Sequence, residues 1–128
     1  MSDRQHLYLV GGLTSTTSTL CQRLDMATIS WSSGPAWTAA RGDFALVASG
    51  TKLYALGGRV WNQSTPTTAV NELDVSAWPA GQWTRRYPDL PSGRVANQAG
   101  FVSAQRMWST GGLTVGSIPL LEHVFLDL

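Results

Sequence analysis

A pair of adjacent glycines occurs three times in this chain of 128 residues, each time directly after a short apolar segment. The three segments read HLYLVGG (6–12), KLYALGG (52–58) and RMWSTGG (106–112), so the glycine pairs lie 46 and 54 residues apart. Periods of roughly 20–50 residues are typical of arrays in which each repeat is one supersecondary unit. The fold is therefore expected to be assembled from similar units stacked on one another.

Further signatures recur in the same order after each glycine pair. A Leu-Asp pair follows at 24–25, 73–74 and 126–127. A tryptophan then follows the first two of these pairs, at Trp31 and Trp83. An arginine opens the next segment, as Arg41 in one case and as Arg94 in the other. One Gly-Gly pair alone would be weak evidence, but an ordered set that recurs at about 50 residues indicates a repeat.

Composition and turn residues favour β-structure in every repeat. Charged residues make up only 13% of the chain, and six Trp and 13 Gly accompany many Thr and Val residues, as expected for an all-β protein with many turns. Each repeat is expected to form one four-stranded antiparallel unit with turn residues between the strands. The expected strands are 6–12, 19–26 and 29–34, then 43–49, 52–58, 69–75 and 82–88, then 97–103, 106–112 and 121–128.

The ordered signatures resemble those of the kelch repeat family: an apolar strand ending in Gly-Gly, a Tyr-Asp-like pair, a spaced Trp and an Arg that opens the next repeat. The sequence departs from that pattern in having Leu in place of Tyr before each Asp. The resemblance covers roughly residues 6–128 and implies a β-propeller of four-stranded antiparallel blades. It implies one partial propeller over 1–128, with blades at about 6–36, 41–90 and 94–128.

Two of these three blades are expected to be incomplete, since the first has no room for an innermost strand and the last none for an outermost strand. A closed propeller needs about four to eight blades. The expected partner is therefore the protein itself, most simply as a dimer that closes a six-bladed ring. Another copy number, or the remaining blades of a longer propeller of which this chain is a piece, would also close the ring.

Loops between the second and third strand of each blade are the first candidates for binding, because loops on a rigid scaffold often carry function. The longest, 59–68, offers Arg59, Trp61 and Asn62, and Trp and Arg are favoured anchors at interfaces. The alternative is that Trp61 packs over the next blade.

Four further candidates lie where each new blade begins. Arg41 and Arg94 resemble the arginine that opens the kelch inner strand, and their alternative role is a structural clamp on backbone carbonyls. Asp43 and Asn97 are expected near the mouth of the channel, where side chains of kelch domains often contact a ligand. Asp and Asn there would suit a polar or cationic group.

Composition excludes several other functions. A net charge of +1 without a run of Lys or Arg argues against a strong electrostatic nucleic-acid binder and against a polybasic membrane anchor. A single cysteine, Cys21, excludes an intrachain disulfide. No signal peptide and no long apolar run is visible, which predicts a cytoplasmic protein.

No pattern typical of a catalytic centre, a metal site or a cofactor site occurs in the sequence. The two histidines, His6 and His123, lack metal-ligand spacing. The sequence therefore favours a non-enzymatic protein-interaction module that binds a protein or a small polar ligand on the loop face. The alternative is a fragment of a larger kelch-type propeller enzyme, such as a carbohydrate oxidase or a sugar-acid isomerase.

Overall fold

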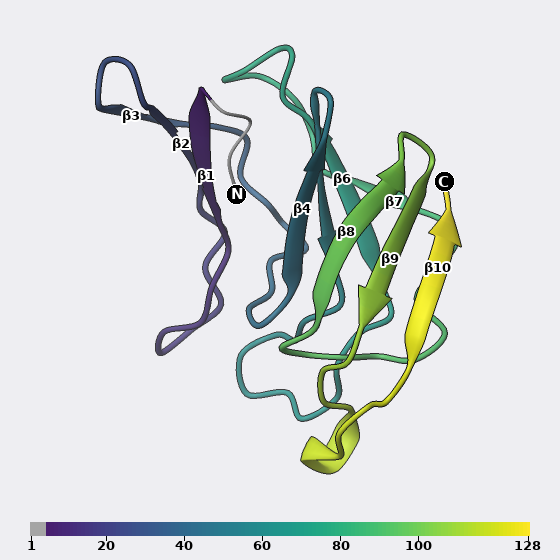
Figure 1. Ribbon diagram of the computed structural model, residues 1–128. Coiled ribbons are helices and arrows are strands. Elements are labelled where there is room, and N and C mark those ends of the chain that lie inside the picture. The colour runs from purple at the N-terminus through teal and green to yellow at the C-terminus, as the bar shows by residue number, and fades with distance from the viewer. Residues whose placement is uncertain (1–4) are drawn as a thin grey trace.

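The structure is a computed structural model that describes residues 5–128 (Figure 1). It is all-β, with three small antiparallel sheets of three, four and three strands, and the predicted grouping of ten strands is confirmed. Sheet 1 contains β1 (His6–Val10), β2 (Cys21–Asp25) and β3 (Ser30–Ser33). Sheet 2 contains β4 (Ala45–Ser49), β5 (Lys52–Leu56), β6 (Val70–Asp74) and β7 (Thr84–Arg86). Sheet 3 contains β8 (Gln98–Ser103), β9 (Arg106–Thr110) and β10 (His123–Asp127), with a short 3₁₀ helix, η1 (Val115–Ser117), before β10.

Most strands are shorter than their sequence pattern predicts. The glycine pairs lie outside the strands, because both glycines of each pair adopt a positive φ that ends the extended backbone. Strand β7 covers three residues instead of the predicted seven. Pro88, which has no N–H to donate to a ladder, follows two residues after its end.

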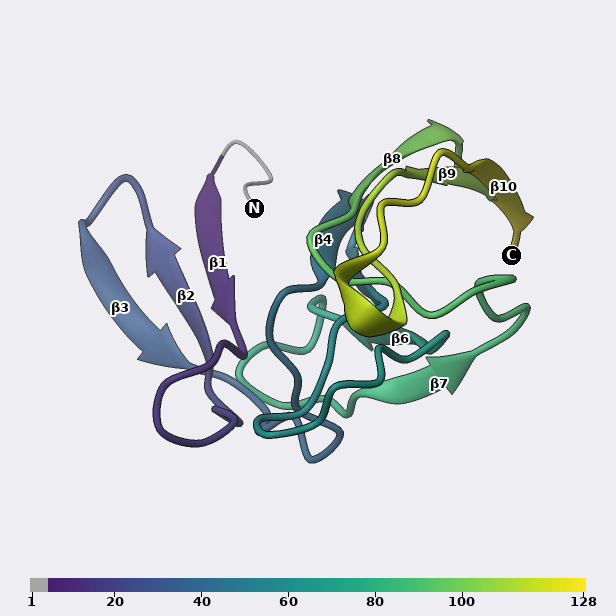
Figure 2. The ribbon, with the colours of Figure 1, turned by 90° about the horizontal axis from the view of Figure 1, so that it is seen from below.

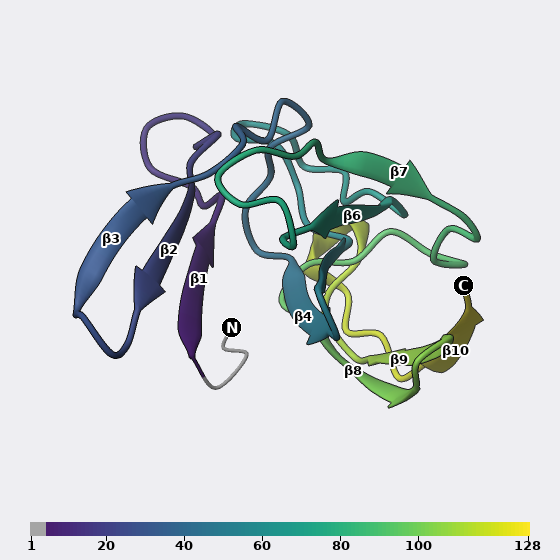
Figure 3. The same cartoon turned by 90° about the horizontal axis from the view of Figure 1, so that it is seen from above.

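The three sheets stand next to one another with their strands in chain order, and each begins with the strand nearest the centre (Figures 2 and 3). Strands β4 and β8 are close neighbours, whereas β7 and β10 at the outer edges of the same two sheets lie apart (Figure 2). The first strands of the sheets, β1, β4 and β8, thus lie toward the centre, and the last strands, β3, β7 and β10, lie at the periphery (Figures 2 and 3).

Sheet 2 is buried on both faces, and this places the core in two layers. In β5, Leu53 and Ala55 pack against sheet 1, while Tyr54 and Leu56 pack against sheet 3. Successive residues of a strand point to opposite faces, so an almost continuous apolar run suits a strand between two other sheets. The four side chains are at most 4% exposed.

Each layer combines residues from both of the sheets that it joins. The layer between sheets 1 and 2 is composed of Tyr8, Val10, Cys21, Trp37, Leu53, Ala55, Leu73 and Trp83. The layer between sheets 2 and 3 is composed of Ala45, Val47, Tyr54, Leu56, Val70, Leu90, Met107 and Leu126. In the first layer, the rings of Trp37 and Trp83 stack with their centroids 5.0 Å apart. Trp37 comes from the connection between sheets, and nothing in the repeat pattern predicted its complete burial.

Two of the recurring aspartates, Asp25 and Asp74, organise turns. Asp25 accepts hydrogen bonds from the backbone N–H groups of Ala27 and Thr28, and Asp74 accepts one from Ser76. These backbone hydrogen bonds lower the pKa of both carboxyl groups. The two turns follow the third strand position of the repeat, so the Leu-Asp signature marks where that strand ends.

All three loops that follow a glycine pair lie at one end of the sheets, at the bottom of Figure 1. These loops are 13–18, 59–68 and 113–119, and the connections between sheets reach the same end. The tight hairpin between β4 and β5 lies at the opposite end. Within residues 5–128, no helix has the length and apolar character needed to cross a membrane.

Candidate binding face at the loop end of the sheets

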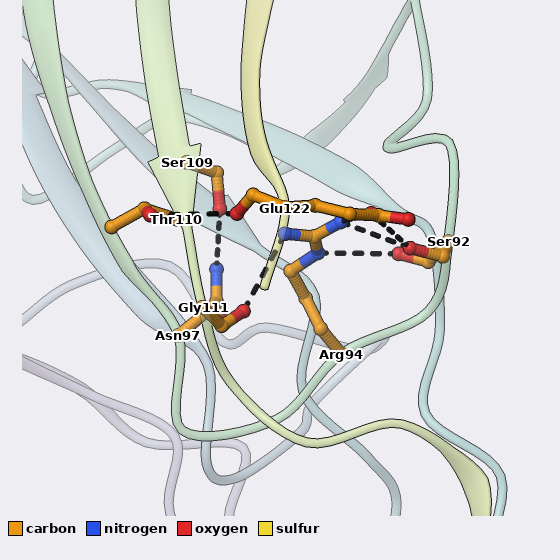
Figure 4. Close-up of polar contacts among 7 residues, drawn as sticks. All are labelled: Ser92, Arg94, Asn97, Ser109, Thr110, Gly111 and Glu122. Atoms are coloured by element: carbon orange, nitrogen blue, oxygen red, sulfur yellow. Dashed lines mark hydrogen bonds and ion pairs between the residues drawn. The ribbon is translucent and has the colours of Figure 1, made fainter. Parts of the chain in front are cut away.

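Arg94 is a fully buried clamp between the connection that leads into β8 and the start of β10 (Figure 4). Its Nη1 donates to the carbonyl oxygen of Gly111 at 3.4 Å. Its Nη2 donates to Ser92 Oγ at 2.9 Å and to Glu122 Oε2 at 2.6 Å. The fork of the guanidinium thus joins three segments, which is the structural role that the sequence offered as the alternative for this residue.

Arg41 occupies the corresponding place one repeat earlier and is 5% exposed. Its Nε donates to the Gly57 carbonyl oxygen at 2.7 Å, and its Nη2 donates to Asn71 Oδ1 at 2.9 Å. Its Nη1 donates to the Ala39 carbonyl oxygen at 3.5 Å. Burial, followed by the nearby positive charge of Arg85, lowers the pKa of Arg41 to about 10. The side chain also lies over the ring of Trp37, with 4.8 Å between the guanidinium carbon and the ring centroid.

Asp43 and Arg59, two predicted site residues, form an ion pair at the same end of the molecule. Arg59 Nε lies 3.0 Å from Asp43 Oδ2, and both side chains are exposed. Asp43 has a φ of 56°, and this left-handed conformation is uncommon for a residue other than glycine. The pair lines a depression of about 350 Å³ at the junction of sheets 2 and 3, whose wall also includes Ser64, Thr114 and Ser117. Polar side chains from three separate segments therefore converge there.

Trp61 and Asn62 are both exposed on the loop 59–68. The backbone N–H of Trp61 donates to Thr17 Oγ1 at 2.6 Å, which fastens this loop to the loop that follows β1. Trp61 as a whole is 46% exposed. The backbone of the loop is thus fixed on the neighbouring sheet while the indole ring remains accessible to solvent.

Asn97 lies inside the protein and not on the open face. It is buried, and its Nδ2 donates to Ser109 Oγ at 3.0 Å (Figure 4). Its Oδ1 is buried and has no hydrogen-bond partner within the described residues. Asn97 and Arg94 therefore differ from the exposed residues Asp43, Arg59 and Trp61 in lying below the binding face.

A second depression, of about 440 Å³, lies at the junction of sheets 1 and 2. Arg41 lines it, together with polar side chains from its own segment and from two others: Thr17, Thr19, Thr38, Gln63 and Thr67. The sequence did not single out these threonines, because they carry no motif and gather only when the sheets pack. The loop 59–68 lies between the two depressions and contributes residues to both.

The described residues contain no group of three or more His, Cys, Asp or Glu side chains able to hold a metal ion. Cys21 is a buried thiol in the layer between sheets 1 and 2. Burial raises its pKa to about 11, so it remains protonated near neutral pH. Cys21 therefore acts as a small apolar core residue.

Comparison with known protein families and with curated proteins identified no relative of this chain. No protein-family model matches the chain, and no curated protein matches it.

Proposed function

We propose that this chain is a non-enzymatic binding module of the kelch-like β-propeller type, and that a second copy covers the open faces of its outer sheets. In this proposal each sheet is one blade. The supporting observation is a comparison of the sheets with one another. Residues on the exposed faces of sheets 1 and 3 occupy the same repeat positions as residues on the buried faces of sheet 2.

The outward face of sheet 1 corresponds to the face of sheet 2 that packs on sheet 1. On sheet 1, Leu24 and Trp31 are cross-strand partners, and Trp31 is 51% exposed. The equivalent pair on sheet 2, Leu73 and Trp83, lies in the layer between sheets 1 and 2, where Trp83 is only 9% exposed. A preceding sheet would therefore bury Trp31 as sheet 1 buries Trp83.

The outward face of sheet 3 corresponds to the other face of sheet 2. Trp108 occupies the place of Tyr54 in the repeat, and Tyr54 is buried against sheet 3. Trp108 pairs across the strands with Phe125, which is 54% exposed. Exposed apolar and aromatic surface of this extent typically marks an interface.

A hydrogen bond between sheets repeats in the same way. The N–H of Gly12 donates to the Arg41 carbonyl oxygen at 3.1 Å, and the N–H of Gly58 donates to that of Arg94 at 2.7 Å. The equivalent N–H, on Gly112, has no protein acceptor among residues 5–128. A further sheet placed after sheet 3 would supply that acceptor from its own opening residue.

A head-to-tail dimer satisfies these requirements, because the sheet 3 face of one copy then packs on the sheet 1 face of the other. Two such contacts related by a two-fold axis would close a ring of six sheets, and closed symmetry is the usual solution for homo-oligomers. In this ring the loop faces of both copies lie on one side. Arg59, Trp61, Asn62 and Asp43 would there present charged, aromatic and amide groups to a protein segment or a small polar ligand.

Sedimentation of the wild-type chain and of two tryptophan variants tests the assembly. The wild type is expected to sediment as a two-chain species. Trp31→Ser is expected to weaken the dimer, because the change lies on the proposed contact face. Trp61→Ser is the matched control, since Trp61 is similarly exposed but lies on a loop, and this variant should remain dimeric.

A folded monomer at all concentrations would overturn the proposed assembly, as would equal sedimentation of the two variants. A chain that forms only irregular aggregates would instead indicate that its missing neighbours are further blades of a longer propeller. Selection of ligands from a peptide library then tests the loop face. Ligands of that face should be lost with Arg59→Ala and Trp61→Ala and retained by Trp31→Ser.

A further inference from the structure

Arg41 and Arg94 occupy the same position in two successive repeats. The side chains that bind Arg94 therefore indicate what kind of group Arg41 could bind. Arg41 and Arg94 each donate to the carbonyl oxygen of the first glycine of the pair in their own sheet, Gly57 and Gly111 respectively. Each also donates to the carbonyl oxygen of the residue two positions before it. The two arginines are therefore equivalent in position and contact corresponding backbone carbonyls, although Nε and Nη1 exchange roles between them.

The clamps differ in the side chains that complete them. Arg94 is completed by the hydroxyl of Ser92 and the carboxylate of Glu122. Glu122 is the residue whose carbonyl oxygen accepts the N–H of Gly111, and Ala69 accepts the N–H of Gly57 in the same way. The counterparts of Ser92 and Glu122 at the Arg41 clamp are thus Ala39 and Ala69. Positions 39 and 69 thus provide neither a carboxylate nor a hydroxyl group. The only side-chain acceptor of Arg41 is the neutral amide of Asn71.

The guanidinium of Arg41 retains donors for another acceptor. An arginine carries five N–H groups, and the three hydrogen bonds of Arg41 involve one N–H from each of its three nitrogens. One N–H on Nη1 and one on Nη2 are left, and this pair matches the two oxygens of a carboxylate. A buried guanidinium without a carboxylate partner is also energetically costly, which favours an incoming anion.

The space for such an acceptor is present. Arg41 and Ala39 both line the 440 Å³ depression between sheets 1 and 2. Thr17, Thr38 and Thr67 from three separate segments contribute to its wall. The positive charge of Arg85 also acts on Arg41, and Arg85 has its own partner in Asp89, at 2.6 Å. The side chains around the depression therefore offer a buried cation and hydroxyl groups but no carboxylate.

We propose that the depression beside Arg41 binds a carboxylate group of a ligand, in the place that the Glu122 carboxylate occupies beside Arg94. The free N–H groups of Nη1 and Nη2 bind its two oxygens, and threonine hydroxyls contact the rest of the ligand. The ion pair between Arg94 and Glu122, at 2.6 Å, shows that a buried arginine at this repeat position can bind a carboxylate that is itself partly exposed. All residues of the site belong to one chain, so the site does not depend on the proposed dimer or on a ligand at Asp43 and Arg59.

Binding is tested on the wild-type chain by NMR titration with probes that differ only in charge. Succinate is compared with its neutral diamide, succinamide. Succinate is expected to produce saturable shifts of the Arg41 side-chain N–H signals and of the Thr38 and Thr67 amides, whereas succinamide should not. Two peptides separate the possible sources of the carboxylate: one carries a single Glu with blocked ends, and the other has only a free C-terminal carboxylate.

Saturable binding of succinate identifies a small acid as a sufficient ligand. Binding of a peptide but not of succinate assigns the carboxylate to a protein segment. If none of the carboxylates produces saturable shifts, or if succinamide produces the same shifts as succinate, the proposal is overturned.

A pair of substitutions tests the site from within the protein. Ala69→Glu places a carboxylate where the other clamp has Glu122, and Ala69→Gln places a neutral side chain of the same size there. Ala69→Glu is expected to have the higher melting temperature near neutral pH and to lose succinate binding. Any overpacking affects both variants equally, so equal melting temperatures would contradict an anion site at Arg41. The titration of the wild type decides the question if neither variant folds.

Discussion

A buried arginine is stabilised by what surrounds its guanidinium, and the two clamps show two solutions in one chain. Arg94 is paired with a carboxylate, whereas Arg41 relies on backbone carbonyls and one amide. The hydrogen bonds that Glu122 accepts from Ser92 and Arg94 lower the pKa of its carboxyl group from 4.5. The ionised form of Glu122 therefore stabilises the folded state.

Glu122→Gln is expected to lower the melting temperature near neutral pH, because it leaves the Arg94 guanidinium without its anionic partner. The folded-state pKa of Glu122 is depressed, so its contribution is present above pH 4.5 and is lost as the pH falls through the folded-state value. The difference between wild type and variant should therefore shrink below about pH 4.5. Thermal denaturation followed by circular dichroism at several pH values measures it.

Asp127→Asn is the control for this experiment. It removes a carboxylate from an ion pair with Arg106 in which both side chains are exposed, and such pairs contribute little to stability. If Glu122→Gln has no larger effect than Asp127→Asn at neutral pH, the Arg94 clamp does not depend on its carboxylate.

At the scale of elements, the junction between sheets is defined by close backbone contact as well as by apolar packing. Gly57 has a φ of 70°, and a Cβ placed there would lie 2.5 Å from the carbonyl oxygen of Arg94 in the connection to the next sheet. Gly11 meets the carbonyl oxygen of Arg41 at the same distance. The glycine pairs are thus required where one sheet passes the opening residue of the next.

Gly57→Ala is expected to be more destabilising than Gly50→Ala. Both positions have a positive φ, which costs about 1–2 kcal/mol for a residue with a Cβ. The position of Gly50 has open space for a Cβ, whereas Gly57→Ala must also move the Arg94 backbone, an overpacking cost of about 1–3 kcal/mol. Urea denaturation of the two variants measures the difference. Similar stabilities would show that the sheets separate at this point without cost.

At the scale of the whole molecule, the sheets differ in how much of their surface is covered. Sheet 2 has a neighbour on each face, whereas sheets 1 and 3 each present one open face with exposed aromatic residues, including Trp31 and Phe125. Under the proposed head-to-tail assembly, both open faces are buried together. Unfolding would then be coupled to dissociation.

The melting temperature is consequently expected to rise with protein concentration, because association stabilises the folded chain by mass action. Differential scanning calorimetry over a hundredfold range of concentration measures the effect. The Trp31→Ser variant should show a weaker dependence than the wild type. A melting temperature that does not change with concentration would argue against any equilibrium between copies of the chain.

The sequence by itself determined the all-β class, the ten strands and their grouping. These features follow from local patterns: glycine pairs that end strands, aspartates that organise turns, and apolar alternation. The strand ends were less well predicted, and β7 covers three residues instead of the predicted seven. Arg41 and Arg94 bind backbone carbonyls, in agreement with the structural clamp that the sequence offered for them beside a binding role.

Only the tertiary structure decided which site residues are accessible. It brought Asp43 and Arg59 together, buried Asn97 under the loop face and left Trp31 exposed, although Trp31 and Trp83 occupy the same position of the repeat. It also gathered the threonines beside Arg41 from segments far apart in the chain. The physical reason is that a repeat specifies which face of a strand is apolar, whereas exposure depends on whether another sheet packs against that face.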